Sequence, residues 1–378
     1  MILGINASRA RSGGARAHLI GILSNIDLHQ HGISEIHVWS FSSLLDALPS
    51  EPWLFKHCPI ELKCSIFRQI LWERFSLPKA LKKNKCSILL NVDAGTVSRF
   101  SPAVTMSRDM LSYEPGEIDR YNYFSKKRIR LVLLRYMQNH SLRFSNAVIF
   151  LTRYAAGVIQ KSCGSLSNIS YIPHGVGKEF TKVQKINSWT YGDKPTIRCL
   201  YISPIWAFKH QWVVVDAIHA LREKGYDINI TFVGGGEPKS LDMLNKKVLS
   251  LDPDKRFVIQ TGHVLHNELS LHLAQADLFI FASSCENMPN TLVESMAAGL
   301  PIVCSNRGPM PEVLEDGGIY FDPENPVEIA EAIEEIITNK DKRKWLAKRA
   351  KELSRQYSWE RCSQETFSVI TQTAKESK

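Results

Sequence analysis

Residues 279–306 read FIFASSCENMPNTLVESMAAGLPIVCSN, and their pattern is the most informative about the fold. Its apolar beginning predicts a buried strand that runs into a loop carrying Glu286. Pro289 suits the first residue of a helix, because a helix start leaves that backbone N–H unused in any case. Gly299 suits the end of the helix, and Pro301 precedes the next strand. The stretch therefore predicts a strand, a helix and a second strand, the repeating unit of α/β proteins.

The start of this predicted helix, capped by Asn287 or Met288, is suited to bind an anion. The free N–H groups of residues 290–292 would point outward, and together with the helix dipole they favour a diphosphate. Glu286 lies before the helix, and Glu294 lies about one turn or more along it at ~1.5 Å per residue. We therefore expect the two carboxylates to bind separate hydroxyl-bearing parts of one extended ligand.

The same alternation continues in both directions along the chain. Short β-prone runs are separated by helix-like stretches throughout, and strands spaced by helices favour parallel, doubly wound sheets. We predict strands near residues 2–6, 35–39, 87–92, 103–106, 147–151 and 169–172, and then near 197–203, 228–233, 257–260, 278–282, 302–304 and 319–321.

These strands fall into two sets, and 378 residues are enough for two domains with a core each. The polar stretch 180–196 has no clear period and is interpreted as the linker. We therefore expect an N-terminal domain over residues 1–182, a C-terminal domain over 183–356 and a final segment over 357–378. Ligands of such sheets bind beyond the carboxyl ends of the strands, so a cleft between the two domains is the expected site.

The net charge of +9 is unevenly distributed. Residues 1–184 contain 24 Lys and Arg against 12 Asp and Glu, a net charge of +12, whereas residues 185–378 contain 23 against 26, a net charge of −3. Such asymmetry indicates an anionic partner for the first half, such as a membrane surface, a phosphorylated ligand or nucleic acid. Nucleic acid is disfavoured, because no recognition motif accompanies the basic residues.

The stretch Phe124–Phe144 is the strongest candidate for this basic surface, because apolar residues interleave its basic ones. A basic amphipathic helix of this kind can lie in an anionic membrane interface. Its membrane-facing residues would be Lys126, Lys127, Arg128 and Arg130. The alternative is a core helix of the first domain with a charged outer face.

Several motifs occur in a fixed order along the chain. Glu286 and Glu294 form an E-x7-E pair, followed by SMAAGLP and by PEV at 311–313, while SGG stands at 12–14, YIPHGV at 171–176 and FVGGG at 232–236. Together these motifs resemble the retaining glycosyltransferases of family 4. That family has the GT-B fold, in which two doubly wound Rossmann-like domains face a central cleft. In similar folds the last segment, here 357–378, is a helix that crosses back to the first domain.

The resemblance implies a role for each matching position. Glu286 would contact the hydroxyls of the transferred sugar, and Glu294 would bind the ribose of the nucleotide. The sugar and the diphosphate would also meet the backbone of the residues after Glu286, which are Asn287, Met288, Pro289, Asn290 and Thr291. Gly13 and Gly14 would let the N-terminal loop approach the donor phosphates. Lys209 would neutralise the departing diphosphate, a role that needs no metal.

Two positions depart from the family pattern. Arg108 stands where a His is common, so we predict Arg108 and Asp109 on the acceptor side, with Asp109 as the catalytic polar residue there. Pro204 stands where an Arg is frequent, and the second positive charge would then come from Arg9, Arg11, Arg16 or Arg307. A front-face displacement, in which the leaving diphosphate helps to take the acceptor's proton, would not require a strong protein base.

A metal site is not expected. Asp252-Pro253-Asp254 has the D-x-D spacing used by metal-dependent sugar transferases. It lies between a predicted helix end and a strand, where Asp and Pro are typical of a polar turn. We therefore expect metal-independent chemistry and no further cofactor.

The sequence and the resemblance together predict a hexosyltransferase with retention of configuration. Its donor would be a UDP- or GDP-linked sugar, and its acceptor a cell-surface polysaccharide, a lipopolysaccharide or a lipid-linked oligosaccharide. No apolar run approaches the ~20 residues that span a bilayer, and no signal peptide is recognised, so we expect a cytoplasmic protein at the inner face of the membrane. The alternatives are a nucleotide-sugar epimerase of related fold and a non-catalytic sugar- or membrane-binding scaffold, which the two glutamates disfavour.

Overall fold

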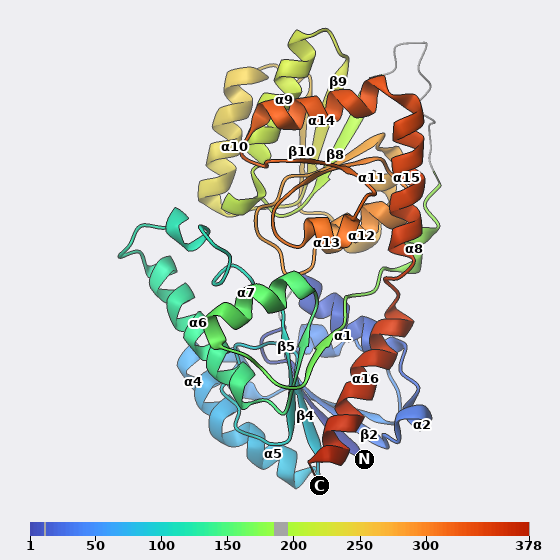
Figure 1. Ribbon diagram of the computed structural model, residues 1–378. Coiled ribbons are helices and arrows are strands. Elements are labelled where there is room, and N and C mark those ends of the chain that lie inside the picture. The colour runs from blue at the N-terminus through green and yellow to red at the C-terminus, as the bar shows by residue number, and fades with distance from the viewer. Residues whose placement is uncertain (11–12, 185–195, 378) are drawn as a thin grey trace. The chain divides into compact units, whose positions relative to one another are not determined.

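The computed structural model describes residues 1–10, 13–184 and 196–377, and the chain divides into two compact units (Figure 1). The first unit comprises Met1–Gly175 together with Tyr357–Lys378, and the second comprises Val176–Gln356. Each unit is built on its own parallel sheet with helices on both faces. The prediction of two doubly wound α/β sheets is therefore confirmed.

The first unit holds a seven-stranded parallel sheet in the order β3-β2-β1-β4-β5-β6-β7. The central strands are buried on both faces, which is why they are mostly apolar, whereas the two edge strands are only partly buried. Their bounds are β1 (Ile2–Asn6), β2 (Glu35–Trp39), β3 (Leu54–His57), β4 (Ile88–Asn91), β5 (Ala103–Ser107), β6 (Ala147–Phe150) and β7 (Ile169–Tyr171).

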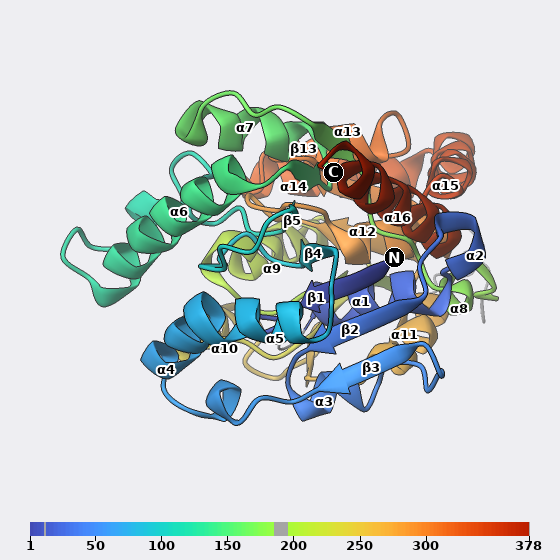
Figure 2. The ribbon, with the colours of Figure 1, turned by 90° about the horizontal axis from the view of Figure 1, so that it is seen from below.

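The direction of the strand connections determines on which face of the sheet each helix of the first unit lies. The strand order reverses after β3, and right-handed connections then place the earlier and later helices on opposite faces (Figures 1 and 2). One face carries α1 (Gly14–Ser24), α2 (Leu28–His31) and α16 (Trp359–Glu376). The other carries α4 (Ile66–Leu71), a π-helical turn η2 (Trp72–Ser76), α5 (Leu77–Lys83), α6 (Lys126–Phe144) and α7 (Arg153–Cys163). The short elements are α3 (Ser42–Leu45), η1 (Ile60–Lys63) and η3 (Ile118–Arg120).

Helix α16 is part of the first unit, although it is the last element of the chain. The Ser358 hydroxyl caps its start by accepting the Arg361 N–H at 3.1 Å. Its apolar face packs beside α1 in the core of the first sheet, and Trp359 lies so close to Gly175 that a Cβ there would come within 2.3 Å of the Trp359 nitrogen. Glycine at position 175 is therefore a packing requirement.

The second unit holds a six-stranded parallel sheet in the order β10-β9-β8-β11-β12-β13. The strands are β8 (Ile197–Ile202), β9 (Ile228–Val233), β10 (Val258–Gly262), β11 (Leu278–Phe281), β12 (Ile302–Ser305) and β13 (Ile319–Phe321). The helices are α8 (Lys178–Thr181), η4 (Ala207–Lys209), α9 (Gln211–Glu223), α10 (Pro238–Leu251), η5 (His266–Glu268), α11 (Leu269–Gln275), α12 (Asn290–Ala297), α13 (Met310–Leu314), α14 (Pro326–Thr338) and α15 (Lys340–Ser354).

The second sheet also reverses its order once, after β10. Helix α9 packs against α10 and α14, whereas α12 packs against α15 (Figure 1). Strands β8 and β11 are neighbours in the sheet, but the chain continues from them in opposite directions. The loops that follow these two strands therefore diverge at this point of the sheet edge. In open α/β sheets this switch point is where ligands bind.

The boundary between the units differs from the prediction at 182/183, because the first unit ends at Gly175. The reason is Phe180 of α8, which is fully buried within the second unit and meets the His266 ring edge-on at 5.3 Å. The predicted linker 180–196 therefore begins with a packed residue, and its part 185–195 lies outside the described residues.

Across the described ranges, no helix is both long enough and apolar enough to cross a membrane.

Candidate active site

Lys209 and Glu286 come from the two loops at the switch point of the second sheet. Lys209 ends η4 after β8, and Glu286 lies in the loop after β11. The Lys209 ammonium donates to Glu286 Oε1, and both side chains are largely buried, with 7% and 14% of their surface exposed. The fold thus joins two predicted catalytic residues that stand 77 positions apart in sequence.

The Lys209 ammonium lies close to two aromatic rings. Its Nζ atom is 5.4 Å from the centroid of the Phe208 ring and 5.2 Å from that of Phe281. The Tyr201 hydroxyl donates to the Lys209 carbonyl oxygen at 2.7 Å and holds the backbone. A cation in such surroundings is weakly solvated, so a nearby negative charge interacts with it strongly.

Hydrogen bonds pin the two loops to each other. The Ser284 N–H donates to the Phe208 carbonyl at 2.9 Å, and the Ser284 hydroxyl lies 2.9 Å from His210 Nε2. His210 has a positive φ of 51°, which is uncommon for a residue with a Cβ. His210 and Ser284 were not among the predicted site residues, although His210 directly follows Lys209 and Ser284 stands two positions before Glu286.

The helix after Glu286 starts one residue later than predicted. Pro289 has φ −84° and ψ 80°, so it caps α12 rather than forming its first turn. The Asn290 N–H donates to the Met288 carbonyl at 3.1 Å, and the Leu292 N–H donates to the Pro289 carbonyl at 3.1 Å. These two amides, expected to be free, are therefore engaged within the chain. Of the other predicted donor contacts, Asn287 and Met288 are buried and Thr291 is partly exposed.

Glu294, the second predicted carboxylate, has a partner of its own. Its Oε1 atom lies 3.0 Å from His266 Nε2, at the start of η5. Burial raises the pKa of Glu294, and the hydrogen bond to Glu294 raises the pKa of His266. The Oε2 atom of Glu294 is buried without a hydrogen-bond partner in the described part of the chain. Glu286 and Glu294 thus have different partners, Lys209 and His266. His266 was not among the predicted site residues.

The proposed substitutes for an arginine at Pro204 differ in their surroundings. Arg307 binds Asp322 and Glu324, with distances of 2.7 Å to each. Arg9 donates to the buried Glu73 at 3.0 Å. Both guanidinium groups are therefore already balanced by carboxylates.

The remaining candidates lie near the start of the first unit. Arg16 lies in the first turn of α1, and Arg11 is outside the described residues. Gly13 caps α1 with φ 62°, a left-handed conformation that suits glycine, and Gly14 is the first residue of the helix.

The D-x-D turn is structural in this fold. Burial alone would raise the pKa of Asp252, but N–H groups of Phe257, Arg256 and Val258 bind the carboxylate at 2.7–2.9 Å and hold its pKa below the ordinary value. Asp254 pairs with Arg256 at 2.7 Å. Among the residues that the structure describes, no cluster of three His, Cys, Asp or Glu side chains could hold a metal ion.

The predicted acceptor-side residues Arg108 and Asp109 directly follow β5 in the first unit, and each has its own hydrogen-bond partner. Arg108 Nη1 donates to His18 Nδ1 at 2.9 Å, while Asp109 Oδ1 accepts the Leu111 N–H at 3.1 Å. Burial lowers the pKa of Arg108 to about 10 and raises the pKa of Asp109. The two side chains therefore have different hydrogen-bond partners within the first unit.

His18 belongs to a buried aromatic cluster with His174 and Trp359. The His18 and His174 rings lie 4.5 Å apart, and both lie about 6 Å from the Trp359 ring, at 5.9 and 6.0 Å. Burial, together with the nearby His174 and Arg108, holds the pKa of His18 well below its usual range. Because a guanidinium can only donate, His18 Nδ1 accepts the hydrogen bond from Arg108.

Glu114 is a buried titratable group that the sequence analysis did not identify. Its carboxylate accepts a hydrogen bond from the Tyr154 hydroxyl of α7. Burial raises its pKa to about 7, and the neighbouring Glu117 adds to that rise. It lies after β5, on the same loop as Asp109.

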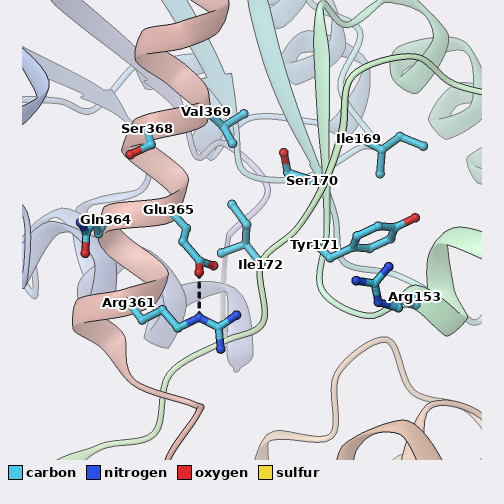
Figure 3. A pocket seen from close by; sticks show the side chains of 10 residues that line it. All are labelled: Arg153, Ile169, Ser170, Tyr171, Ile172, Arg361, Gln364, Glu365, Ser368 and Val369. Carbon is cyan, nitrogen blue, oxygen red and sulfur yellow. Dashed lines mark hydrogen bonds and ion pairs between the residues drawn. The ribbon is translucent and has the colours of Figure 1, made fainter.

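A cavity of about 580 Å³ lies in the first unit between β7 and α16 (Figure 3). Arg361 reaches Glu365 on α16 at 2.7 Å, and Arg153 lies over the Tyr171 ring at 4.5 Å. None of the predicted catalytic or donor-binding residues lines this cavity.

The comparisons with known proteins relate the chain to glycosyltransferases. Residues 196–339 match the family model of the glycosyl transferases group 1. An uncharacterized glycosyltransferase of Methanocaldococcus jannaschii is 24% identical over 238 residues, which is 60% of each chain. The GDP-mannose-dependent alpha-(1-6)-phosphatidylinositol monomannoside mannosyltransferase of Mycobacterium tuberculosis is 26% identical over 215 residues, 52% of this chain and 54% of that relative. The chain thus matches between half and three fifths of the length of these relatives.

Solved structures extend the likeness of fold to both units. The structure of HepE from Anabaena in complex with UDP and glucose has a TM-score of 0.70 at 18% identity, covering 98% of this chain and 99% of that one. The chain therefore has the GT-B fold, and within it residues 196–339 match the glycosyl transferases group 1.

Proposed function

We propose that the protein is a retaining glycosyltransferase that moves a sugar from a nucleotide-sugar donor to an acceptor hydroxyl. The observation that carries the proposal is the largely buried Lys209–Glu286 pair at the switch point of the second sheet. The match of residues 196–339 to the glycosyl transferases group 1 covers both of these residues and supports it.

On the donor side, Lys209 would bind the diphosphate and Glu286 the hydroxyls of the transferred sugar. A positive group held in place before the reaction stabilises the charge that develops on a leaving diphosphate. The buried, unpartnered Oε2 atom of Glu294 would accept a hydrogen bond from a ribose hydroxyl, since buried polar atoms without partners are rare. His266, on the other oxygen, would orient this carboxylate.

The names of similar proteins support a nucleotide-linked donor without choosing its base. The HepE structure is named as a complex with UDP and glucose, and the mycobacterial relative is named GDP-mannose-dependent. We propose a UDP- or GDP-linked hexose as donor. The acceptor would be a cell-surface polysaccharide or a lipid-linked oligosaccharide, with Arg108 and Asp109 on the acceptor side.

The proposed chemistry needs neither a metal nor a strong protein base. In a front-face displacement the bond to the diphosphate breaks while the acceptor oxygen bonds to the same face of the anomeric carbon. The leaving diphosphate takes the acceptor's proton, and Lys209 balances the negative charge left on it. Configuration at the anomeric carbon is then retained.

Donor turnover tests this function. The purified protein is incubated with UDP- and GDP-linked hexoses, with and without a saccharide-lipid extract, and released nucleoside diphosphate and the anomeric configuration of the product are measured. We expect acceptor-dependent release, retention, and no effect of a chelator. Glu286→Gln should lower the rate by about 10²–10³-fold, as loss of a single preorganised hydrogen-bonding contact to the transition state does, whereas Glu334→Gln on the surface of the same unit should not.

Two results would overturn this function. Isomerisation of the donor sugar without an acceptor would favour an epimerase. Full transfer by Glu286→Gln, shown to be folded by thermal melting, would remove Glu286 from the site.

A further inference from the structure

Helix α6 exposes apolar side chains along its outer face. Ile129, Leu133, Tyr136 and Phe144 are all exposed and recur at intervals of three, four and eight residues, so they form one stripe. Tyr136 is 75% exposed. The opposite face of the helix packs inward through Leu131 and Leu142. The outer face is therefore not the purely charged surface expected of a core helix.

A second exposed stripe lies on α4 and η2. Phe67, Leu71 and Phe75 are exposed at intervals of four residues, with Ile66 beside them. Their spacing again places them on one helical face. Large apolar side chains in such a row are unusual on a protein surface.

The loop before α6 adds two exposed aromatic rings. Tyr123 and Phe124 are 71% and 87% exposed and meet edge-on at 5.2 Å. Ser125 then caps α6 by accepting the Arg128 N–H at 3.2 Å. The exposed aromatic pair therefore lies directly before the capped start of α6.

The two stripes belong to one face of the first unit. Figures 1 and 2 both place α4 and α6 on the same side of the sheet. Arg99 contacts His140 of α6 and lies 4.2 Å from the Phe144 ring. Burial and the guanidinium groups of Arg99, Arg143 and Arg74 lower the pKa of His140, so Arg74 of η2 also lies near α6.

The charges on and beside the stripes are mostly basic, with the exposed Asp119, which pairs with Arg128 at 2.9 Å, as an exception. Residues 121–144 contain six Lys and Arg and no acidic residue. Residues 66–83 contain five Lys and Arg and one acidic residue, Glu73, which is buried and bound to Arg9. The surface that accompanies the apolar stripes is therefore strongly basic.

This combination fits a lipid surface better than a protein partner. Lys is depleted at protein–protein interfaces, whereas basic residues beside exposed aromatic and aliphatic ones are typical of segments in a membrane interface. Anionic headgroups attract each nearby Lys or Arg, and long basic side chains can reach them while apolar neighbours insert.

We propose that this face of the first unit, defined by the stripes on α6 and on α4–η2 and by the Tyr123–Phe124 tip, binds an anionic lipid bilayer. The tip and the stripes enter the interface, and the flanking basic residues contact the headgroups. The proposal concerns binding alone and stands independently of glycosyl transfer.

Vesicle co-sedimentation of the full chain tests the proposal. The probes are vesicles of phosphatidylcholine with phosphatidylglycerol and vesicles of phosphatidylcholine alone. We expect binding to the first, weakening with salt, and little binding to the second. Lys126→Gln with Lys127→Gln should weaken binding by about tenfold or more, because each basic residue near an anionic surface contributes ~1 kcal/mol.

Apolar variants separate insertion from simple charge attraction. Tyr123→Ser with Phe124→Ser, and separately Leu133→Ser with Tyr136→Ser, should reduce binding while leaving thermal melting unchanged, since these side chains are exposed. The matched control is Val327→Ser with Trp345→Ser, which removes two exposed apolar residues from the second unit and should bind as the original chain does.

Three results would overturn the proposal. The original chain would fail to bind anionic vesicles, or both apolar double variants would bind as well as it does. Alternatively, light scattering would show self-association that the Leu133→Ser with Tyr136→Ser variant abolishes, and the face would then be an interface between copies of the chain.

Discussion

The Lys209 ammonium is a cation in largely apolar surroundings, and its charge is balanced by a carboxylate from another loop. Taking one partner from a buried pair leaves the other charge unbalanced, which costs far more than breaking a pair in water. The same unit offers a contrast, because Lys224 and Glu334 form an ion pair on its surface.

We predict that Glu286→Gln lowers the free energy of unfolding by about 3 kcal/mol, toward the lower end of values for buried pairs. Glu334→Gln should change it little, because surface ion pairs contribute little to stability. Urea unfolding of both variants measures the difference. Equal effects would mean that the Lys209–Glu286 pair is solvated in the folded protein.

The His266–Glu294 pair makes stability depend on pH. Its His266 pKa is raised mainly by the hydrogen bond to Glu294, with Glu179 adding to that rise, while burial lowers it in part. A His whose pKa is raised by folding contributes stability that is complete below its ordinary pKa of 6.5 and is lost as pH rises through the folded pKa. The raised pKa of Glu294 has the same sign, since folding again favours the protonated form.

We therefore predict that the chain is more stable than His266→Gln at about pH 6 and that this advantage shrinks by about pH 9. Thermal melting across this range measures it. A His272→Gln variant on α11 controls for the loss of a histidine outside the pair. A constant difference at all pH values would show that His266 is not charged against Glu294.

The sequence predicted roles for Lys209, Glu286 and Glu294, but it did not reveal that Lys209 pairs with Glu286 or that Glu294 pairs with His266. The partners come from distant strands, so no local spacing indicates them: His266 lies 28 residues from Glu294. The positive φ of His210 is likewise set by its neighbours in space, because a histidine in sequence carries no preference strong enough to reveal it. Arg108 was expected at an acceptor site, and only the fold shows its contact with His18.

At the scale of elements, α8 shows why the linker was misplaced. Four residues are too short for a periodic pattern, and their neighbours are polar. Helix α8 nevertheless packs against α12, the helix that carries Glu294, and Phe180 is the buried residue of α8. A single buried aromatic residue therefore attaches this segment to the second unit.

We predict that Phe180→Ala lowers the free energy of unfolding by about 3–5 kcal/mol, as for other buried aromatic side chains. Val327→Ala, at an exposed position of α14, should have a small effect. Chemical unfolding followed by tryptophan fluorescence measures both. A small effect of Phe180→Ala would show that Phe180 does not pack in the second unit and belongs to the linker.

Most other elements were predictable from alternation alone, because parallel strands buried on both faces are short apolar runs. Strand β3 was missed: it has four residues, lies at the sheet edge and pairs only with β2. The start of α12 was displaced by one residue, because Pro289 is compatible with both the cap and the first turn of a helix.

For the whole molecule, the main structural fact is that the first unit is closed by the last helix of the chain. Phe367, Ile370 and Ala374 of α16 are buried in the core of the first sheet. The first unit therefore needs both ends of the sequence.

We predict that a chain ending at Gln356 loses protection from protease in its first unit while the second unit stays protected. A chain ending at Lys375 keeps those buried residues and should resist digestion as the full chain does. Limited proteolysis with identification of the fragments by mass distinguishes the two. Equal protection of the first unit in both chains would show that α16 is dispensable for its core.

Nucleoside diphosphate binding tests the proposed nucleotide-sugar site in the second unit. Thermal melting is measured with UDP, GDP and ADP for the original chain and for Glu294→Gln. A ligand that binds only the folded state raises the melting temperature. We predict that UDP or GDP raises it for the original chain and raises it less for Glu294→Gln. The absence of any shift with all three nucleotides, or equal shifts in both chains, would contradict the proposed site.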